Sequence, residues 1–424
     1  MKDLNQAASR MQSGSAGTEE LQDFYERMPY PPPLTSLDDH RELYNNPERS
    51  RALFHLMWPT ERFRADQEIL VAGCGTAQAA KYALRESRAR ITAIDISETS
   101  LIHTRNLQHK YGLDNLKLHQ LSISDVHKLG ETFDHIVCTG VLHHLADPDL
   151  GLRSLRDVLK PEGAMQIMVY GKYGRTGIYM MKEYCKVLAI SASNQELLTL
   201  GEVLNDLPRD HPLIPLLRQG LDFLHPNALA DAFLHPLDRA FTVPEIYEWL
   251  DRCGMCLGRW FEQAPYLSQC GVLERTPHAT RLSELPERTQ HTVVELFRGT
   301  ITRHNFIAYR SDRLTERQPI CFRDEKWRQY VPIRLPWTVC VRDNVPAGSV
   351  AVLVNRAHKH PDLALAISEA QYQLFTDIDG RRTLGEIAQS SRKEEVSTLE
   401  FFRQLWRYDQ VVFDASHIAS TSQR

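Results

Sequence analysis

Two glycines one residue apart follow an apolar segment in the first quarter of the chain. Residues 69–72 (Ile-Leu-Val-Ala) predict a buried strand, which ends at Gly73 and Gly75 before helical sequence starts at Gln78. Glycine has no Cβ and reaches backbone angles that are closed to other residues, so a ligand can approach such a loop closely. The free N–H groups of the loop also lie at the positive end of the next helix. The segment predicts a site for a polar or anionic nucleotide-like ligand, although a plain strand-to-helix turn can carry the same glycines.

The residue at position 78 bears on the kind of nucleotide. A dinucleotide fingerprint, G-x-G-x-x-G/A, that started at Gly73 would need a small residue at position 78. The chain has Gln78 there, so a dinucleotide ligand is disfavoured.

An acidic residue stands where a doubly wound fold would use one. Residues 89–97 predict a second apolar strand with Asp95 near its end, about 20 residues beyond the glycine loop. In doubly wound folds a carboxylate at this distance accepts hydrogen bonds from ribose hydroxyls. The alternative is that Asp95 caps the following helix, but Ser97 can serve equally well as the cap, which favours ribose binding for Asp95.

Strand-like and helix-like segments then continue to alternate. Residues 116–121 predict a third strand, residues 133–145 a fourth strand that runs into a loop, and residues 164–170 a fifth. The spacing of apolar residues predicts a helix over residues 150–159, which Lys-Pro-Glu-Gly at 160–163 is expected to end. Five strands with intervening helices indicate a parallel sheet covered on both faces.

Together these motifs resemble the class I S-adenosylmethionine-dependent methyltransferases, whose fold is Rossmann-like. Residues 72–76 are similar to the family's methionine-binding glycine loop, and residues 94–97 to the strand end that carries its ribose-binding acid. Residues 133–134 and 140–145 are similar to the fourth strand and the loop beneath the sulfonium, and residues 159–163 to the turn before strand five.

The resemblance extends to about residue 310. Residues 241–255 are similar to the helix and turn before the family's sixth strand, and residues 303–310 to its reversed seventh strand. The expected fold class is therefore α/β: a doubly wound, seven-stranded, mostly parallel sheet, with helical insertions at residues 176–240 and 281–299.

The resemblance also implies which residues bind the cofactor. They are Ala72, Gly73, Cys74 and Gly75 at the methionine end, Asp95 and Ile96 at the ribose, Ser122 and Ile123 at the adenine, and Thr139, Gly140 and Val141 at the methylene next to sulfur. The chain departs from the family at two positions: Val71 replaces an acid that usually precedes the first glycine by two residues, and Ala77 replaces a common third glycine. The group that replaces the missing acid cannot be identified from the sequence.

Two histidines in the loop after the fourth strand are the candidate catalytic residues. Methyl transfer is an in-line displacement that depends mainly on positioning, and the scheme requires no metal. If the acceptor is a hydroxyl, its proton must leave, and histidine has the unperturbed pKa nearest to neutral pH. His143 and His144 stand in the right loop, and at most one is expected to face the substrate. The alternative is that both are structural.

The sequence suggests three parts. Residues 1–65 are expected to form an N-terminal helical lid, residues 66–310 the S-adenosylmethionine-binding methyltransferase domain, and residues 311–424 a C-terminal module. Within the lid, Tyr25 or Tyr30 is expected either to touch cofactor or acceptor or simply to pack.

The C-terminal module is expected to be a smaller α+β domain. Residues 374–388 predict a helix, an Asp-Gly turn and a second helix, and they resemble winged-helix modules that include peptide-carrier proteins. Helix-turn-helix binding to DNA is the alternative, but Glu394, Glu395 and Glu400 disfavour a surface that faces phosphates. The module is expected to bind a carrier or partner protein or to present a substrate.

Composition limits the kinds of partner. The net charge of −4 argues against general electrostatic binding to nucleic acid, and the arginines between 281 and 328 alternate with acids as on a solvated helical face. No apolar run is long enough to span a membrane and no signal peptide is evident, so a cytoplasmic protein is expected. Cys253 and Cys256 form the one C-x-x-C pair, which indicates buried thiols rather than a zinc site.

The expected function is transfer of a methyl group from S-adenosylmethionine to a small-molecule acceptor at oxygen, nitrogen or carbon. RNA or protein methylation remains an alternative, although an Asn-Pro-Pro-Tyr-like stretch typical of many base-amino methyltransferases is missing after strand four. A regulatory protein that binds S-adenosylmethionine without catalysis is the third alternative, motivated by Val71 and the large appended region. The acceptor cannot be read from the sequence, because insertions with variable chemistry build acceptor pockets on this fold.

Overall fold

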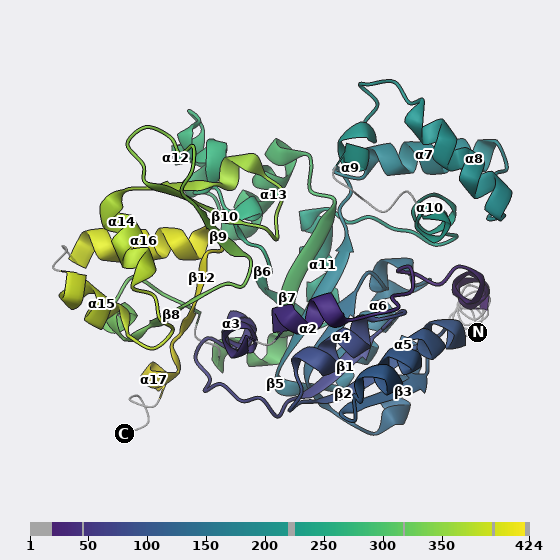
Figure 1. The fold of residues 1–424 in the computed structure, drawn as a ribbon, viewed down its shortest axis with the longest axis horizontal. Coiled ribbons are helices and arrows are strands. Elements are labelled where there is room, and N and C mark those ends of the chain that lie inside the picture. Colours follow the sequence, from purple (N-terminus) through teal and green to yellow (C-terminus); the bar gives the residue numbers. More distant parts are fainter. Residues whose placement is uncertain (1–18, 45, 219–224, 317–318, 392–394, 420–424) are drawn as a thin grey trace, which may run out of the picture. The chain divides into compact units, whose positions relative to one another are not determined.

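A computed structural model describes residues 19–44, 46–218, 225–316, 319–391 and 395–419 (Figure 1). The chain divides into two compact units. The first contains residues 1–42, 66–257 and 298–311, and the second contains residues 43–65, 258–297 and 312–424. This division by compactness differs from the expected three-part division, which rests on function and stays a prediction.

A seven-stranded sheet organises the first unit. Its order is β3-β2-β1-β4-β5-β7-β6, with parallel pairing from β3 to β5 and an antiparallel β7 beside β5. The strands are β1 Glu68–Ala72, β2 Arg90–Asp95, β3 Leu116–Gln120, β4 Phe133–Thr139, β5 Leu159–Tyr170, β6 Met255–Trp260 and β7 Arg303–Arg310. The predicted doubly wound α/β fold is confirmed.

Helices alternate with these strands. They are α2 Asp38–Tyr44, α4 Gln78–Arg85, α5 Glu98–Tyr111, η1 Ile123–Leu129, η2 Leu142–His144, α6 Pro148–Asp157, α7 Thr176–Val187, α8 Asn194–Asn205, α9 Ile214–Arg218, α10 Pro226–Leu229, η3 Ala230–Leu234 and α11 Val243–Arg252. Alanines of α4 and leucines of α5 pack on the apolar side chains of β1 and β2 in one buried cluster. Helix α4 follows the carboxyl end of β1 after a short loop, and helix α5 follows that of β2. Because these strands are parallel, both loops lie at the same edge of the sheet.

The segment predicted as a turn before the fifth strand lies inside that strand. Helix α6 ends at Asp157, and β5 already begins at Leu159, so the prediction of a turn over residues 160–163 is wrong. The register with β4 jumps from Phe133↔Leu159 to His135↔Ala164, which makes the segment a bulge. A bulge accommodates the extra residues, including a proline that cannot donate to the ladder.

The insertion between β5 and β6 is helical, as predicted. Helices α7 to α10 and η3 share a buried apolar cluster, which also contains Phe24 of an N-terminal helix over residues 19–27, and Figure 1 shows α7 to α10 gathered together. Helix α10 continues into η3, Ala230–Leu234, which is a π-helix. Single π-helical turns often mark functional positions.

The second unit is a mixed α+β body. It contains α3 Pro47–Met57, η4 Ala264–Tyr266, η5 Gly271–Arg275, α12 Ala279–Ser283, α13 Glu287–Arg298, η6 Ser311–Glu316, η7 Glu325–Gln329, β8 Val331–Arg334, β9 Thr338–Val341, β10 Ala351–Asn355, η8 Pro361–Leu363, β11 Leu365–Ile367, α14 Glu369–Thr376, α15 Leu384–Ser391, α16 Glu395–Arg407, β12 Val411–Asp414 and α17 Ser416–Ala419. Strands β11-β10-β9 and β12-β8 form two small antiparallel sheets. The predicted helix, Asp-Gly turn and helix correspond to α14, Gly380 at φ +71° and α15. Glu394 lies outside the described residues.

None of the helices among the described residues has the length and apolar character needed to cross a membrane.

Candidate functional site

The loop after β1 has the backbone geometry that its glycines predict. Gly73 and Gly75 have φ values of +71° and +55°, a region that other residues rarely adopt. The amide of Gly73 donates a hydrogen bond of 2.9 Å to the carbonyl of Ile94 on β2. A Cβ on Gly73 would overlap a methyl group of Val141, so the loop and the segment after β4 can pack closely only because this residue is glycine.

Asp95 at the end of β2 holds the glycine loop. Its Oδ2 accepts a hydrogen bond of 2.8 Å from the amide of Gly75, and its Oδ1 accepts one of 3.0 Å from the amide of Ser97. The hydroxyl oxygen of Ser97 accepts from the amide of Ser100, which makes Ser97 the cap of α5. The capping alternative for Asp95 is therefore resolved in favour of Ser97, and burial raises the pKa of the Asp95 carboxyl. The neighbouring Ile96 belongs to the same turn.

The segment after β4 lies beside this loop, because β4 pairs with β1 in the sheet. Thr139 ends β4, and Gly140 follows at φ +80°. The carboxamide nitrogen of Gln78, the first residue of α4, donates a hydrogen bond of 2.6 Å to the hydroxyl oxygen of Thr139. Val71 is completely buried in β1. Sequence reasoning used Gln78 only against a dinucleotide, whereas the structure places its side chain between the glycine loop and β4.

The residues expected near the adenine follow β3. Ser122 precedes the short helix η1, and Ile123 is its buried first residue. The amide of Leu121 donates to the carbonyl of Asp95, so this segment starts beside the end of β2. The structure thus brings the residues expected at the methionine, ribose and adenine to one edge of the sheet, and their roles stay predictions. Ala72 and Cys74 are buried there as well.

The N-terminal segment contacts the glycine loop. The hydroxyl of Thr76 donates a hydrogen bond of 2.7 Å to the carbonyl of Pro31, and the carbonyl oxygen of Tyr30 would be 2.9 Å from a Cβ on Gly75. The Glu26 carboxylate accepts hydrogen bonds from two amides in the first turn of α5, with its Oε1 at 2.7 Å from the first. Tyr30 and Pro31 therefore lie beside the glycine loop and Glu26 beside the start of α5, and the role of residues 1–65 as a lid stays a prediction.

His143 and His144 form the helical turn η2 and are both buried. The Nδ1 of His144 lies 2.8 Å from the carbonyl oxygen of Leu237. Because a carbonyl only accepts, Nδ1 carries the proton in neutral His144 and Nε2 keeps its lone pair. Within the part of the chain that the structure describes, neither ring nitrogen of His143 has a hydrogen-bond partner. Burial lowers the pKa of both imidazoles, so both are neutral at physiological pH.

A buried carboxylate from the insertion faces His144. Asp231, in the π-helix η3, accepts hydrogen bonds from the hydroxyls of Tyr25 at 3.2 Å and Tyr170 at 3.4 Å. Its nearest carboxylate oxygen lies within 4.8 Å of a His144 nitrogen. Burial raises the pKa of Asp231, and burial together with Asp231 raises that of Tyr25. Sequence reasoning missed Asp231, although an acid inside the apolar run Ala228–Leu234 was an available signal.

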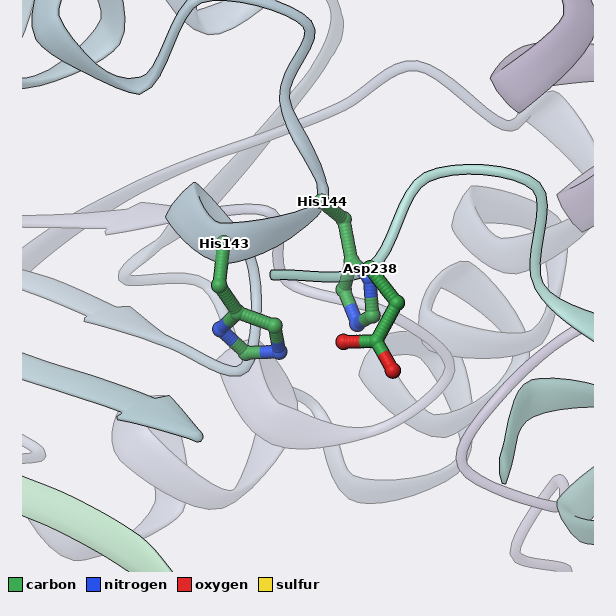
Figure 2. Close-up of side chains that lie close together, drawn as sticks. All are labelled: His143, His144 and Asp238. Atoms are coloured by element: carbon green, nitrogen blue, oxygen red, sulfur yellow. The ribbon is translucent and has the colours of Figure 1, made fainter. Parts of the chain in front are cut away.

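Asp238 completes the cluster. Figure 2 shows its carboxylate beside the ring of His144, with the His143 ring turned toward the same space. Lys182 on α7 lies 3.7 Å from Asp238 Oδ2, and Arg175 stacks 3.4 Å above the ring of Tyr170. The cluster therefore combines two carboxylates, two cations and neutral imidazoles.

Two overlapping groups in this cluster have the spacing of metal ligands. His143, His144 and Asp238 form one, and His144, Asp231 and His235 form the other, with the ligand atoms of each group within 4.8 Å of one another. Nδ1 of His235 accepts the amide hydrogen of Leu237, so the proton of the neutral ring is on Nε2 and no lone pair is left for a metal. Asp238 already pairs with Lys182, which competes with a cation in the first group. Hydrogen bonding and ion pairing therefore already occupy ligand atoms in both groups, and the expectation that no metal is needed stays a prediction.

Comparison with known families defines the class of the domain. Residues 70–165 match the model of a methyltransferase domain. This match begins within β1 and ends within β5, so it includes the glycine loop, Asp95 and the two histidines. The predicted resemblance to the S-adenosylmethionine-dependent methyltransferases is confirmed for this part of the chain.

Similar individual proteins extend the comparison. The uncharacterized protein syc1184_c of Synechococcus sp. is 32% identical over 256 residues, which are 57% of this chain and 60% of that protein. The chain thus spans less than two thirds of the length of that relative. The structure of PKMT2 from Rickettsia typhi has a TM-score of 0.61 at 14% identity over 88% of this chain and 75% of its own. The same protein in complex with AdoHcy gives a TM-score of 0.62 at 15% identity over 91% of this chain and 77% of its own. At an identity this low, the two matches show only that this chain and PKMT2 share a fold.

Proposed function

We propose that this chain transfers a methyl group from S-adenosylmethionine to a small-molecule acceptor. The observation that carries the proposal is the hydrogen bond from the Gly75 amide to Asp95, because it joins a ligand-binding loop to a ribose-binding type of carboxylate within a methyltransferase domain. The binding of AdoHcy, the demethylated form of the cofactor, by the similarly folded PKMT2 supports the choice of cofactor.

The cofactor would lie along the edge of the sheet from α4 to η1. Each oxygen of Asp95 accepts one backbone N–H and keeps a second lone pair, which can accept from a ribose hydroxyl. The methionine carboxylate fits the N-terminus of α4, where Ala77 provides no side-chain cap and the helix dipole favours an anion. Ser122 and Ile123 would border the adenine.

The acceptor would bind at the cluster of His143, His144, Tyr170 and Asp231. His143 and His144 follow the end of β4, Tyr170 is the last residue of β5, and Asp231 comes from the insertion. His143, His144 and Asp231 are buried. Burial favours an acceptor whose reacting group is small. The C-terminal module would then serve a carrier or partner protein rather than the chemistry.

His144 would accept the proton of a hydroxyl or ammonium acceptor. The acceptor proton goes to Nε2 of His144, the freed electron pair of the acceptor forms a bond to the methyl carbon, and the pair of the breaking C–S bond stays on sulfur. The sulfonium thereby becomes a neutral thioether. Hydrogen bonding of Nδ1 to Leu237 orients the ring, and Asp231 and Asp238 stabilise the imidazolium that forms.

Labelled cofactor tests this function. Purified protein is incubated with S-adenosylmethionine carrying a labelled methyl group and with fractionated metabolite, RNA and protein extracts; label is expected in a metabolite fraction. His144→Gln should lower the rate at saturating cofactor, whereas His109→Asn, at an exposed position on α5, should not. Calorimetric binding of the cofactor without label in any fraction would indicate a regulatory binding protein, and label only in RNA or protein would refute the small-molecule acceptor.

A further inference from the structure

The missing acid at position 71 leaves one charge of the cofactor without an obvious partner. The amino-acid end of S-adenosylmethionine carries a carboxylate and an ammonium. The N-terminus of α4 suits the carboxylate, but its partial positive charge repels the ammonium. Val71 offers only methyl groups and is completely buried. The two oxygens of Asp95 hold the backbone of Gly75 and Ser97, and the proposed function assigns their remaining lone pairs to the ribose hydroxyls.

Gln78 is placed to meet this need. It is the first residue of α4, directly after the glycine loop, and its side chain reaches across to Thr139 at the end of the neighbouring strand β4. Among the described residues, Thr139 is the hydrogen-bond partner of its carboxamide. The bond uses the amide nitrogen, so Oε1 keeps both lone pairs, and the residue is only partly buried. A carboxamide oxygen held at this point can accept a hydrogen bond from an ammonium.

We propose that Gln78, fixed by Thr139, takes the place of the missing acid and binds the ammonium of the cofactor's methionine. The inference deepens the proposed function and rests on it. Gln78 is a positioning residue: it sets the sulfonium in line with the acceptor by holding the end of the cofactor that lies beyond the sulfur.

Ligands with and without the amino-acid end provide the test. Calorimetry on the full chain compares S-adenosylmethionine with 5′-methylthioadenosine, which has the adenosine and sulfur but no ammonium. Gln78→Met keeps the length of the side chain and removes its polar atoms. It is expected to weaken S-adenosylmethionine by about 10- to 100-fold, as for loss of a hydrogen bond to a charged group, and to leave 5′-methylthioadenosine unchanged. Gln195→Met, in the exposed first turn of α8, is the matched control and should change neither.

A second variant fixes which end of the carboxamide faces the ligand. If Oε1 meets the ammonium, Gln78→Glu restores an acid and should retain or tighten binding of S-adenosylmethionine. Weaker binding by Gln78→Glu would mean that the amide nitrogen faces the carboxylate, and would overturn the proposal.

The outcomes separate this inference from the proposed function. If the unaltered protein binds no S-adenosylmethionine, the proposed function fails. If it binds and Gln78→Met binds equally well, only the role of Gln78 fails. If Gln78→Met weakens 5′-methylthioadenosine to the same extent, Gln78 supports the loop rather than the ammonium, and the proposal is also wrong.

Discussion

Replacing Asp231 by asparagine should slow methyl transfer without releasing the cofactor. The carboxylate is buried and its hydrogen-bond donors are the hydroxyls of Tyr25 and Tyr170. Asparagine has nearly the same shape and keeps one oxygen, which can accept from one of the two hydroxyls, because Tyr25 donates to Oδ1 and Tyr170 to Oδ2. The substitution therefore removes the negative charge that faces His144 and one of these two hydrogen bonds.

The size of the expected rate loss follows from the distance between the Asp231 carboxylate and the His144 ring. A carboxylate oxygen of Asp231 lies within 4.8 Å of the ligand nitrogen of His144. With an effective dielectric constant of about 20, two unit charges at that distance attract by about 3 kcal/mol. This attraction exists only while His144 is protonated, so it lowers the barrier and not the ground state. The expected loss is about 100-fold in the rate of the chemical step, since each 1.4 kcal/mol is a factor of ten.

Single-turnover methyl transfer to the active acceptor fraction measures this rate. The acidic limb of its pH profile reports the pKa of the base. Burial already lowers the pKa of His144, and loss of Asp231 should lower it further and move the limb to lower pH. Asp210→Asn, exposed on the same insertion, is the matched control. An unchanged rate in Asp231→Asn, or a loss explained by weaker cofactor binding, would refute the assignment of the base and its partner.

Three further predictions concern the cofactor loop and pH. Asp95→Ala removes the acceptor of the Gly75 amide and the expected ribose contact, and it should abolish labelling; normal cofactor affinity by calorimetry would contradict this. Gly73→Ala places an alanine in a left-handed backbone conformation and brings its Cβ into a clash with Val141, so we expect a lower Tm and weaker cofactor binding. Wild-type values of both the Tm and the cofactor affinity would disprove this. Burial lowers the pKa of His235 to about 2 and of His291 to about 4, so below pH 6.5 the folded state binds fewer protons than the unfolded chain and stability falls as pH falls. At pH 5.5 each of these two histidines lowers the free energy of unfolding by about 1.4 kcal/mol. His291→Asn should therefore reduce, by about that amount, the loss of unfolding free energy measured between pH 7.5 and pH 5.5.

The sheet was predictable because its strands and helices obey local rules. Buried parallel strands read as apolar runs, and the helix starts carry recognisable caps such as Ser97 and Asp147. The prediction of a turn over residues 160–163 was wrong for a physical reason. Lys-Pro-Glu-Gly is turn-like locally, but pairing with β4 makes it part of a bulged strand. Tertiary pairing overrode local propensity there.

The candidate site likewise contains residues that sequence patterns predict and residues that only the structure brings together. The residues expected to bind the cofactor follow the ends of β1, β2, β3 and β4 in sequence, so motif spacing was enough to predict that they lie at one edge of the sheet. Asp231 and Asp238 come from an insertion whose path no local pattern fixes, and their meeting with His144 depends on the π-helix and on the bond to Leu237. Gln78 was visible in the sequence, but its meaning depended on knowing that Thr139 lies within reach.

One residue of the N-terminal segment, Tyr25, contacts both the turn after β2 and the insertion. The Tyr25 hydroxyl bonds to Asp231, and its backbone carbonyl accepts a hydrogen bond of 3.3 Å from Ser97, two residues beyond Asp95. Burial and then the charge of Asp231 raise the pKa of the Tyr25 hydroxyl. A change in the position of this segment would therefore disturb both Ser97, which lies beside the expected ribose contact, and Asp231. Two hydrogen bonds of Tyr25 therefore join the N-terminal segment to the turn after β2 and to the insertion.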